Sequence, residues 1–97
     1  MKTIKEIKQV LEQLKPSLQG RFQVTSLGVF GSYVREESTP QSDLDILVEL
    51  GAPMGLFKFI ELENFLSQAL ETKVDLVMKD ALKPYIKERI LQEVAYI

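Results

Sequence analysis

The 97-residue chain contains neither cysteine nor histidine. The absence of cysteine excludes disulfides, thiolate nucleophiles and thiolate metal sites. The absence of histidine excludes hydrolase triads built on imidazole, zinc sites with imidazole ligands and the commonest general base. Any acid–base or metal chemistry in this chain must therefore use aspartate and glutamate side chains.

Long apolar runs and a strong excess of one charge are also missing. No segment approaches the roughly 18 apolar residues of a membrane-spanning helix, and the N-terminal segment is charged, so we expect a cytoplasmic protein with no membrane partner. The net charge of −2 gives no electrostatic reason to expect nucleic acid as a direct partner. The length and the apolar fraction of 45% are typical of one globular domain, here residues 1–97.

Apolar periodicity and turn residues predict an α/β fold, a small mixed sheet of about three strands with helices packed on it. Thr3 and Glu6 have the spacing of a capping box and predict a helix over residues 4–19, with an irregularity at Pro16 and an end near Gly20. Further on we expect strands over 22–30, 44–50 and 73–78, a short helix over 32–37, a helix over 56–70, and a final helix that is capped by Asp80 and extends its apolar stripe to Ile97.

The connections between these elements predict which strand ends meet. A short connector joins the first two strands, which are therefore expected to be antiparallel. The helix over 56–70 has the length of a crossover between parallel strands. Asp75, near the start of the third strand, would then lie beside Asp43 and Asp45 at the start of the second.

Three aspartates gathered in this way are difficult to explain by structure alone. Asp43 and Asp45 are two residues apart, so in a strand they face the same side. At about 5 Å and an effective dielectric constant near 20, each like-charge pair costs about 3 kcal/mol, a large fraction of the stability of a small domain. Oxygen ligands suit Mg²⁺, and two such ions can activate an attacking oxygen and stabilise a leaving phosphate.

The turn that faces these carboxylates has the features of a phosphate-binding turn. Gly31 would let a phosphate approach the backbone, and Ser32 with the amides after it would contact phosphate oxygens. Arg35 would either neutralise a phosphate or pair with Glu36 or Glu37. A plain turn and a solvated strand end are the alternatives for each motif taken alone.

Taken together, the motifs resemble the signature of the polymerase-beta-like nucleotidyltransferase superfamily: Gly31-Ser32, ten residues, then Asp43-x-Asp45, with Arg35 and Ser42 inside the interval. Within that superfamily the chain is similar to the minimal nucleotidyltransferases over nearly all of its length. The resemblance implies that Asp43 and Asp45 bind magnesium and that Asp75 is the third metal-site carboxylate, which activates the acceptor hydroxyl. It also implies that the nucleotide is bound by Gly31, Ser32, Arg35 and Ser42. Judged from its local sequence, Ser42 is expected to fix the loop before Asp43 through a hydrogen bond.

Members of this group are typically antitoxins whose partner is a HEPN-domain ribonuclease toxin. They silence that toxin by adenylylating one of its tyrosines, with ATP as the substrate, which implies a hetero-oligomer and a Mg²⁺-dependent transferase, with two ions expected. The chain departs from the family at Glu36, where glycine is usual. The alternative function is a catalytically silent module that neutralises the toxin by occlusion, and transfer to RNA is disfavoured because no further domain is present to grip it.

One apolar surface remains open to two interpretations. The helix over 56–70 carries Phe57, Ile60 and Phe65 beside its main stripe, so its apolar face is wider than one buried stripe requires. These side chains belong either to the core or to a docking surface for the partner.

Overall fold

The computed structural model describes residues 2–97 as three helices packed on a sheet of four strands. The helices are α1 (Ile4–Phe22), α2 (Leu56–Leu70) and α3 (Pro84–Glu93), the strands are β1 (Val24–Phe30), β2 (Leu44–Leu50), β3 (Val74–Met78) and β4 (Ala95–Tyr96), and two short 3-10 turns are η1 (Gly31–Tyr33) and η2 (Lys79–Ala81). The predicted mixed α/β sheet is confirmed, with four strands in the order β3-β2-β1-β4 where about three were expected.

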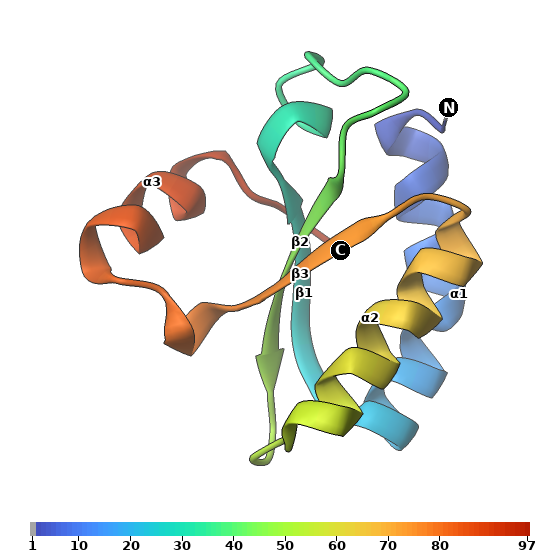
Figure 1. Cartoon of the computed structure of the whole chain (residues 1–97), viewed down its shortest axis with the longest axis vertical. Coiled ribbons are helices and arrows are strands. Elements are labelled where there is room, and N and C mark those ends of the chain that lie inside the picture. The colour runs from blue at the N-terminus through green and yellow to red at the C-terminus, as the bar shows by residue number, and fades with distance from the viewer. Residues whose placement is uncertain (1) are drawn as a thin grey trace.

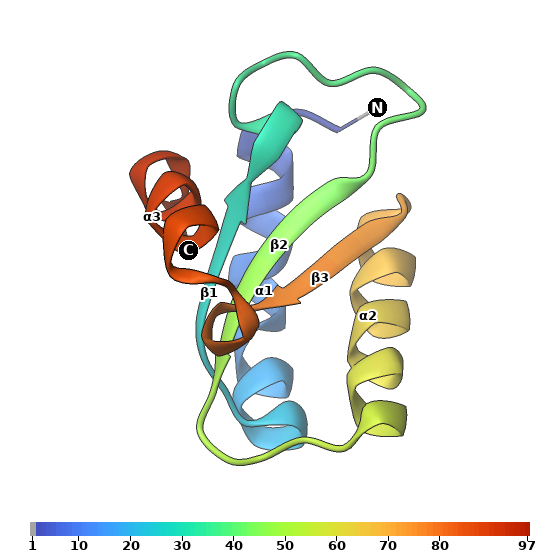
Figure 2. The same ribbon diagram turned by 60° about the vertical axis from the view of Figure 1, so that its left-hand side comes forward.

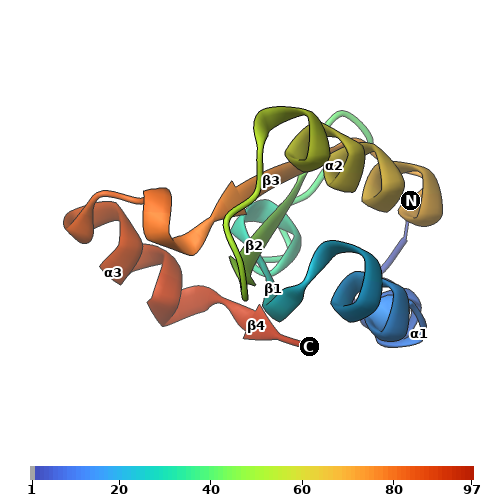
Figure 3. The same ribbon diagram turned by 90° about the horizontal axis from the view of Figure 1, so that it is seen from below.

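The helices are divided unequally between the two faces of the sheet. Helices α1 and α2 run side by side over one face, whereas α3 stands on the other side, away from them (Figures 1 and 3). The connector between η1 and β2 lies at the same end of the sheet as the start of α1 (Figure 2). The second face is therefore only partly covered, and the candidate carboxylates lie on that face.

Strand pairing follows the predicted topology. Strands β1 and β2 are antiparallel, with Phe30 opposite Asp45, and β2 and β3 are parallel, with Asp45 opposite Asp75. Helix α2 provides the crossover that a parallel pair needs.

The core lies between the sheet and the α1–α2 layer, and it is what fixes the direction of the strand side chains. Leu44, Ile46 and Val48 alternate along β2 and are almost completely buried. Their helical partners are equally buried, namely Ile7, Leu11, Leu18 and Phe22 of α1 and Leu62, Leu66 and Leu70 of α2. Each such side chain contributes about 1.5–3 kcal/mol relative to leaving it exposed, so a shift of register by one residue is strongly disfavoured.

Helix α1 confirms its predicted start but not its predicted end. Thr3 and Glu6 form the expected capping box. The helix passes through Pro16 and Gly20 and ends at Phe22, because Leu18 and Phe22 are buried in the core and favour continuation.

The C-terminal region departs most from the prediction. Asp80 lies in η2 and does not cap α3, whose N-cap is Lys83. The final helix ends at Glu93, and Ala95–Tyr96 form β4, which pairs with β1. The N–H of Ile97 then donates to the Leu27 carbonyl over 2.9 Å. The free backbone edge of β1 is satisfied in this way, which a continued helix would not achieve. The short helix expected over 32–37 is likewise reduced to η1.

Side chains of α2 cover the other edge of the sheet. The Leu76 N–H donates to the Glu63 carboxylate and the Val74 N–H donates to the Ser67 hydroxyl, both over 3.0 Å. These contacts occupy backbone amides of the edge strand β3 that another strand would use.

Two further surface properties bear on function. On the first turns of α2, Leu56, Phe57 and Ile60 are 70%, 87% and 42% exposed, so they do not belong to the core, whereas Phe65 packs against it. The docking interpretation of that exposed group stays a prediction. Across residues 2–97, no helix combines the length and apolarity needed to cross a bilayer.

Candidate functional site

Two carboxylates lie opposite each other at the end of the sheet where β2 and β3 begin. The register pairs Asp45 of β2 with Asp75 of β3, and Asp43 precedes Asp45 by two residues. Because Leu44 and Ile46 on either side of Asp45 point into the core, Asp45 faces the opposite side of the sheet. The topology thus brings all three predicted acidic residues to one end of the sheet.

The environment of Asp45 disfavours its negative charge. Burial, chiefly, and the charges of Asp75 and Asp43 together raise the pKa of Asp45 to about 6, although Arg35 opposes the shift. A carboxylate held in this way gains much from a nearby cation, since the cation offsets both the repulsion and the lost hydration.

Asp43 lies beside a cation of the chain itself. The Lys73 Nζ is 3.9 Å from Asp43 Oδ2, and both side chains are exposed. Within residues 2–97, no group of three or more histidine, cysteine, aspartate or glutamate side chains is gathered closely enough to hold a metal. Asp45 and Asp75 therefore form an adjacent pair across β2 and β3, and Asp43 lies two residues before Asp45, near Lys73.

The donor chemistry of this group nevertheless fits a divalent cation. Carboxylate oxygens are the ligands that Mg²⁺ prefers, and one or two protein carboxylates usually suffice because substrate phosphates and water complete the shell. The raised pKa of Asp45 indicates that its charge is not neutralised by the surrounding protein. Asp43, Asp45 and Asp75 thus remain the residues that would hold such an ion.

The Gly31 turn packs directly against Asp45. Gly31 has φ +80, in the left-handed region that favours glycine, and a Cβ added there would meet the Asp45 carboxylate. The turn is closed by Val34 and Arg35 N–H groups that donate to the Gly31 carbonyl over 3.1 Å. Gly31 is therefore held next to the Asp45 carboxylate, and Ser32 follows it in the same turn.

Arg35 is engaged by two glutamates. Its Nε donates to Glu37 over 2.9 Å, as one of the alternatives from the sequence foresaw. Its Nη1 donates to both oxygens of Glu93 over 3.0 and 3.1 Å, and the N–H of Gly31 donates to the same Glu93 carboxylate over 2.7 Å. Glu93 lies at the end of α3 and joins the turn to the C-terminal segment.

Ser42 orders the loop that leads into β2. The Thr39 N–H donates to Ser42 Oγ over 2.9 Å, and the Ser42 N–H donates to the Thr39 carbonyl over 3.0 Å. This is the local role expected from the sequence, and it places Ser42 immediately before Asp43.

Sequence reasoning missed Glu93 and did not foresee the backbone conformation of Glu36. Glu93 is separated from Gly31 by 62 residues and occupies an ordinary polar position of an amphipathic helix, so no local pattern marks it. Glu36 was noted only as a departure from the usual glycine; its φ of 60 shows why glycine suits this position, and its side chain is exposed.

Comparison with known proteins finds similarity to nucleotidyltransferases in both sequence and structure. The nucleotidyltransferase domain family matches residues 4–97. Protein adenylyltransferase MntA of Thermococcus cleftensis is 48% identical over 97 residues, which cover 100% of this chain and 98% of that protein. A solved structure described provisionally as a minimal nucleotidyltransferase has a TM-score of 0.75 at 30% identity, over 92% of this chain and 93% of that chain.

A further solved structure, of a tri-AMPylated Shewanella oneidensis HEPN toxin in complex with MNT antitoxin, has a TM-score of 0.65 at 20% identity. It covers 93% of this chain and 66% of that chain. At this level of identity the similarity shows the fold alone.

Proposed function

Because the chain belongs to the nucleotidyltransferase domain family and is a nucleotidyltransferase, we propose that it transfers AMP from ATP to a tyrosine of a HEPN-domain toxin and so acts as an antitoxin. The observation that carries this proposal is the pairing of Asp45 with Asp75 across β2 and β3, against the Gly31 turn. The relative named as a protein adenylyltransferase supports a protein acceptor, and the AMPylated HEPN toxin in the solved complex, whose antitoxin shares this fold, supports a toxin as that protein; the choice of tyrosine rests on the family resemblance.

In the proposed reaction, the tyrosine hydroxyl oxygen forms a bond to the α-phosphorus of ATP. The bond from that phosphorus to the bridging oxygen breaks, and pyrophosphate leaves. Asp75 accepts the hydroxyl proton, which its exposed position at the start of β3 allows. Asp43 and Asp45 would hold Mg²⁺, which when bound supplies positive charge to the triphosphate.

The remaining residues would act by positioning. Gly31 and Ser32 would contact the triphosphate, and Arg35 would offset its charge. Ser42 would keep Asp43 in place through the loop contacts with Thr39. Catalysis of this kind depends mainly on orientation and charge neutralisation.

The experiment that tests this function uses the full chain with the toxin encoded beside it. The two proteins are incubated with ATP and Mg²⁺, and the intact mass of each is measured. We expect the toxin to gain one or more adenylyl groups on tyrosine, with no gain when Asp43 and Asp45 are both replaced by asparagine. An unchanged toxin mass with every nucleotide tested would overturn the proposal.

One observation favours the alternative of neutralisation by occlusion. Leu56, Phe57 and Ile60 form an exposed apolar group on α2 that a partner could cover. The same double variant separates the two functions. We expect it to bind the toxin but fail to neutralise it, whereas full neutralisation by the variant would show that binding is sufficient.

A further inference from the structure

We propose that Glu93 is a positioning residue for the transfer reaction, because its carboxylate joins the Gly31 amide to the Arg35 guanidinium and so fixes both groups beside Asp45. This inference rests on the proposed function and adds to it a residue from the opposite end of the chain. It assigns the C-terminal segment a part in nucleotide binding.

The contacts of Glu93 are short and partly shielded from solvent. One of its oxygens accepts from the Gly31 N–H over 2.7 Å, and both accept from Arg35 Nη1 over 3.0 and 3.1 Å. Its side chain is 27% exposed, against 62% for Glu37, the other carboxylate on Arg35. Charge-assisted hydrogen bonds of this kind are about twice as strong as neutral ones, and burial strengthens them further.

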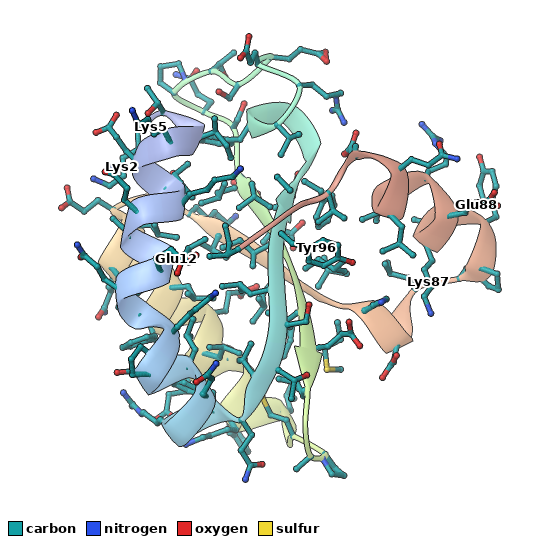
Figure 4. The ribbon with its side chains drawn as sticks, turned by 180° about the vertical axis from the view of Figure 1, so that it is seen from behind. Lys2, Lys5, Glu12, Lys87, Glu88 and Tyr96 are labelled. Atoms are coloured by element: carbon teal, nitrogen blue, oxygen red, sulfur yellow. The ribbon has the colours of Figure 1, made fainter. Side chains whose placement is uncertain are left out.

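The C-terminal segment that carries Glu93 is itself held firmly on β1. Strand β4 pairs with β1 at Gly28 and Val29. Glycine at 28 lets Val94 lie against the strand, since a Cβ there would collide with the Val94 side chain. Figure 4 shows Tyr96 of β4 lying between the sheet and α3. The backbone next to Glu93 is therefore anchored, and the carboxylate acts as a fixed support.

Glu93 contacts the Gly31 turn from a side that leaves room for the nucleotide, so we expect it to support the turn and not to compete with the triphosphate. In the sheet order β3-β2-β1-β4, β1 lies between β2, which carries Asp45, and β4, which follows Glu93. Glu93 therefore holds the Gly31 amide from the β4 edge, while Asp45 packs against the other side of the same turn. The side that faces Asp45 and Asp75 is left for the substrate.

The test compares Glu93→Ala and Glu93→Gln with Glu37→Ala, a matched control that removes the other carboxylate from Arg35. The rate of AMP transfer is measured against ATP concentration in the presence of Mg²⁺, and ATP affinity is measured separately by calorimetry. Exchange of the Gly31 amide hydrogen, followed by NMR without nucleotide, reports on the contact independently of activity.

We expect Glu93→Ala to raise the KM and Kd for ATP about tenfold and to accelerate Gly31 amide exchange about tenfold, because the variant removes the carboxylate that accepts from both Gly31 and Arg35. Glu93→Gln keeps an acceptor for Gly31 but loses the charge on Arg35, so its KM should lie between those of wild type and Glu93→Ala. If Glu93→Ala does not fold, Glu93→Gln alone is used, and a KM for ATP above that of wild type supports the proposal. Glu37→Ala should stay within twofold of wild type.

A KM that falls in the Glu93 variants would show that the carboxylate competes with the triphosphate, and would overturn the proposal. An unchanged KM with faster Gly31 exchange would show a purely structural contact, and would overturn it equally. These results differ from a failure of the proposed function, in which the wild type would neither bind ATP nor transfer AMP, and which would remove the role of Glu93 as well.

Discussion

Replacement of Asp45 by asparagine should stabilise the protein in metal-free buffer while it abolishes transfer. Burial and the charges of Asp75 and Asp43 raise the Asp45 pKa from 3.8 to about 6. The folded state therefore holds the Asp45 proton more tightly than the unfolded state does. Its ionisation lowers stability as the pH rises from about 4 to above 6, and the penalty is fully present at pH 8.

The size of the effect follows from the shift in pKa. Two pKa units correspond to about 3 kcal/mol, and partial exposure of Asp45 reduces this through solvent screening to about 1–2 kcal/mol. Asp45→Asn removes the ionisable group, so the free energy of unfolding of the variant should exceed that of wild type by this amount at pH 8. At pH 4 the two proteins should be almost equally stable. For a domain of this length 1 kcal/mol corresponds to about 4–8 °C in Tm.

The assay is urea unfolding of wild type and variant in a chelating buffer at pH 4 and pH 8. The difference in free energy of unfolding between variant and wild type is calculated at each pH. Its change between pH 4 and pH 8 reports on Asp45 alone, because the other carboxylates are present in both proteins. Asp43→Asn is the matched control and should gain less, because Asp43 is exposed and lies near Lys73. An Asp45→Asn variant that is no more stable than wild type at pH 8 would refute the reasoning.

Three further predictions concern backbone positions and the sheet edge. Gly31→Ala should lower the free energy of unfolding by at least about 1–2 kcal/mol and remove most transfer activity, because φ is +80 and the added Cβ would meet Asp45. A urea unfolding curve equal to that of wild type would contradict this. Glu36→Gly should raise the Tm by a few degrees, about 1 kcal/mol, by relieving the φ of 60, and a lowered Tm would refute it. Glu63→Ala should cost about 1–2 kcal/mol in urea unfolding, since it frees the Leu76 amide, and an unchanged midpoint would count against this.

Local patterns were sufficient for the elements that form the centre of the fold. The strand Leu44–Leu50 and the helix Leu56–Leu70 have the predicted bounds, because alternation and helical periodicity are expressed within each segment. The pairing of Asp45 with Asp75 also followed from topology, since a crossover helix requires parallel strands that start at the same end.

Contacts between distant segments were not predictable in this way. The apolar residues of the last turn continue a helical stripe to Ile97, yet the free edge of β1 recruits Ala95–Tyr96 as a strand. Glu93 stands just before that strand, and its partners Gly31 and Arg35 lie 62 and 58 residues away in the sequence. The position of Lys73, 3.9 Å from Asp43, was likewise not predictable from any local pattern.

The most direct test of the account is a crystal structure of the chain with Mg²⁺ and a non-hydrolysable ATP analogue. The account predicts a divalent ion bound by Asp43 and Asp45, with the triphosphate against Gly31 and Ser32 and Asp75 near the α-phosphorus. A nucleotide bound elsewhere, or an ion that none of these carboxylates contacts, would contradict it.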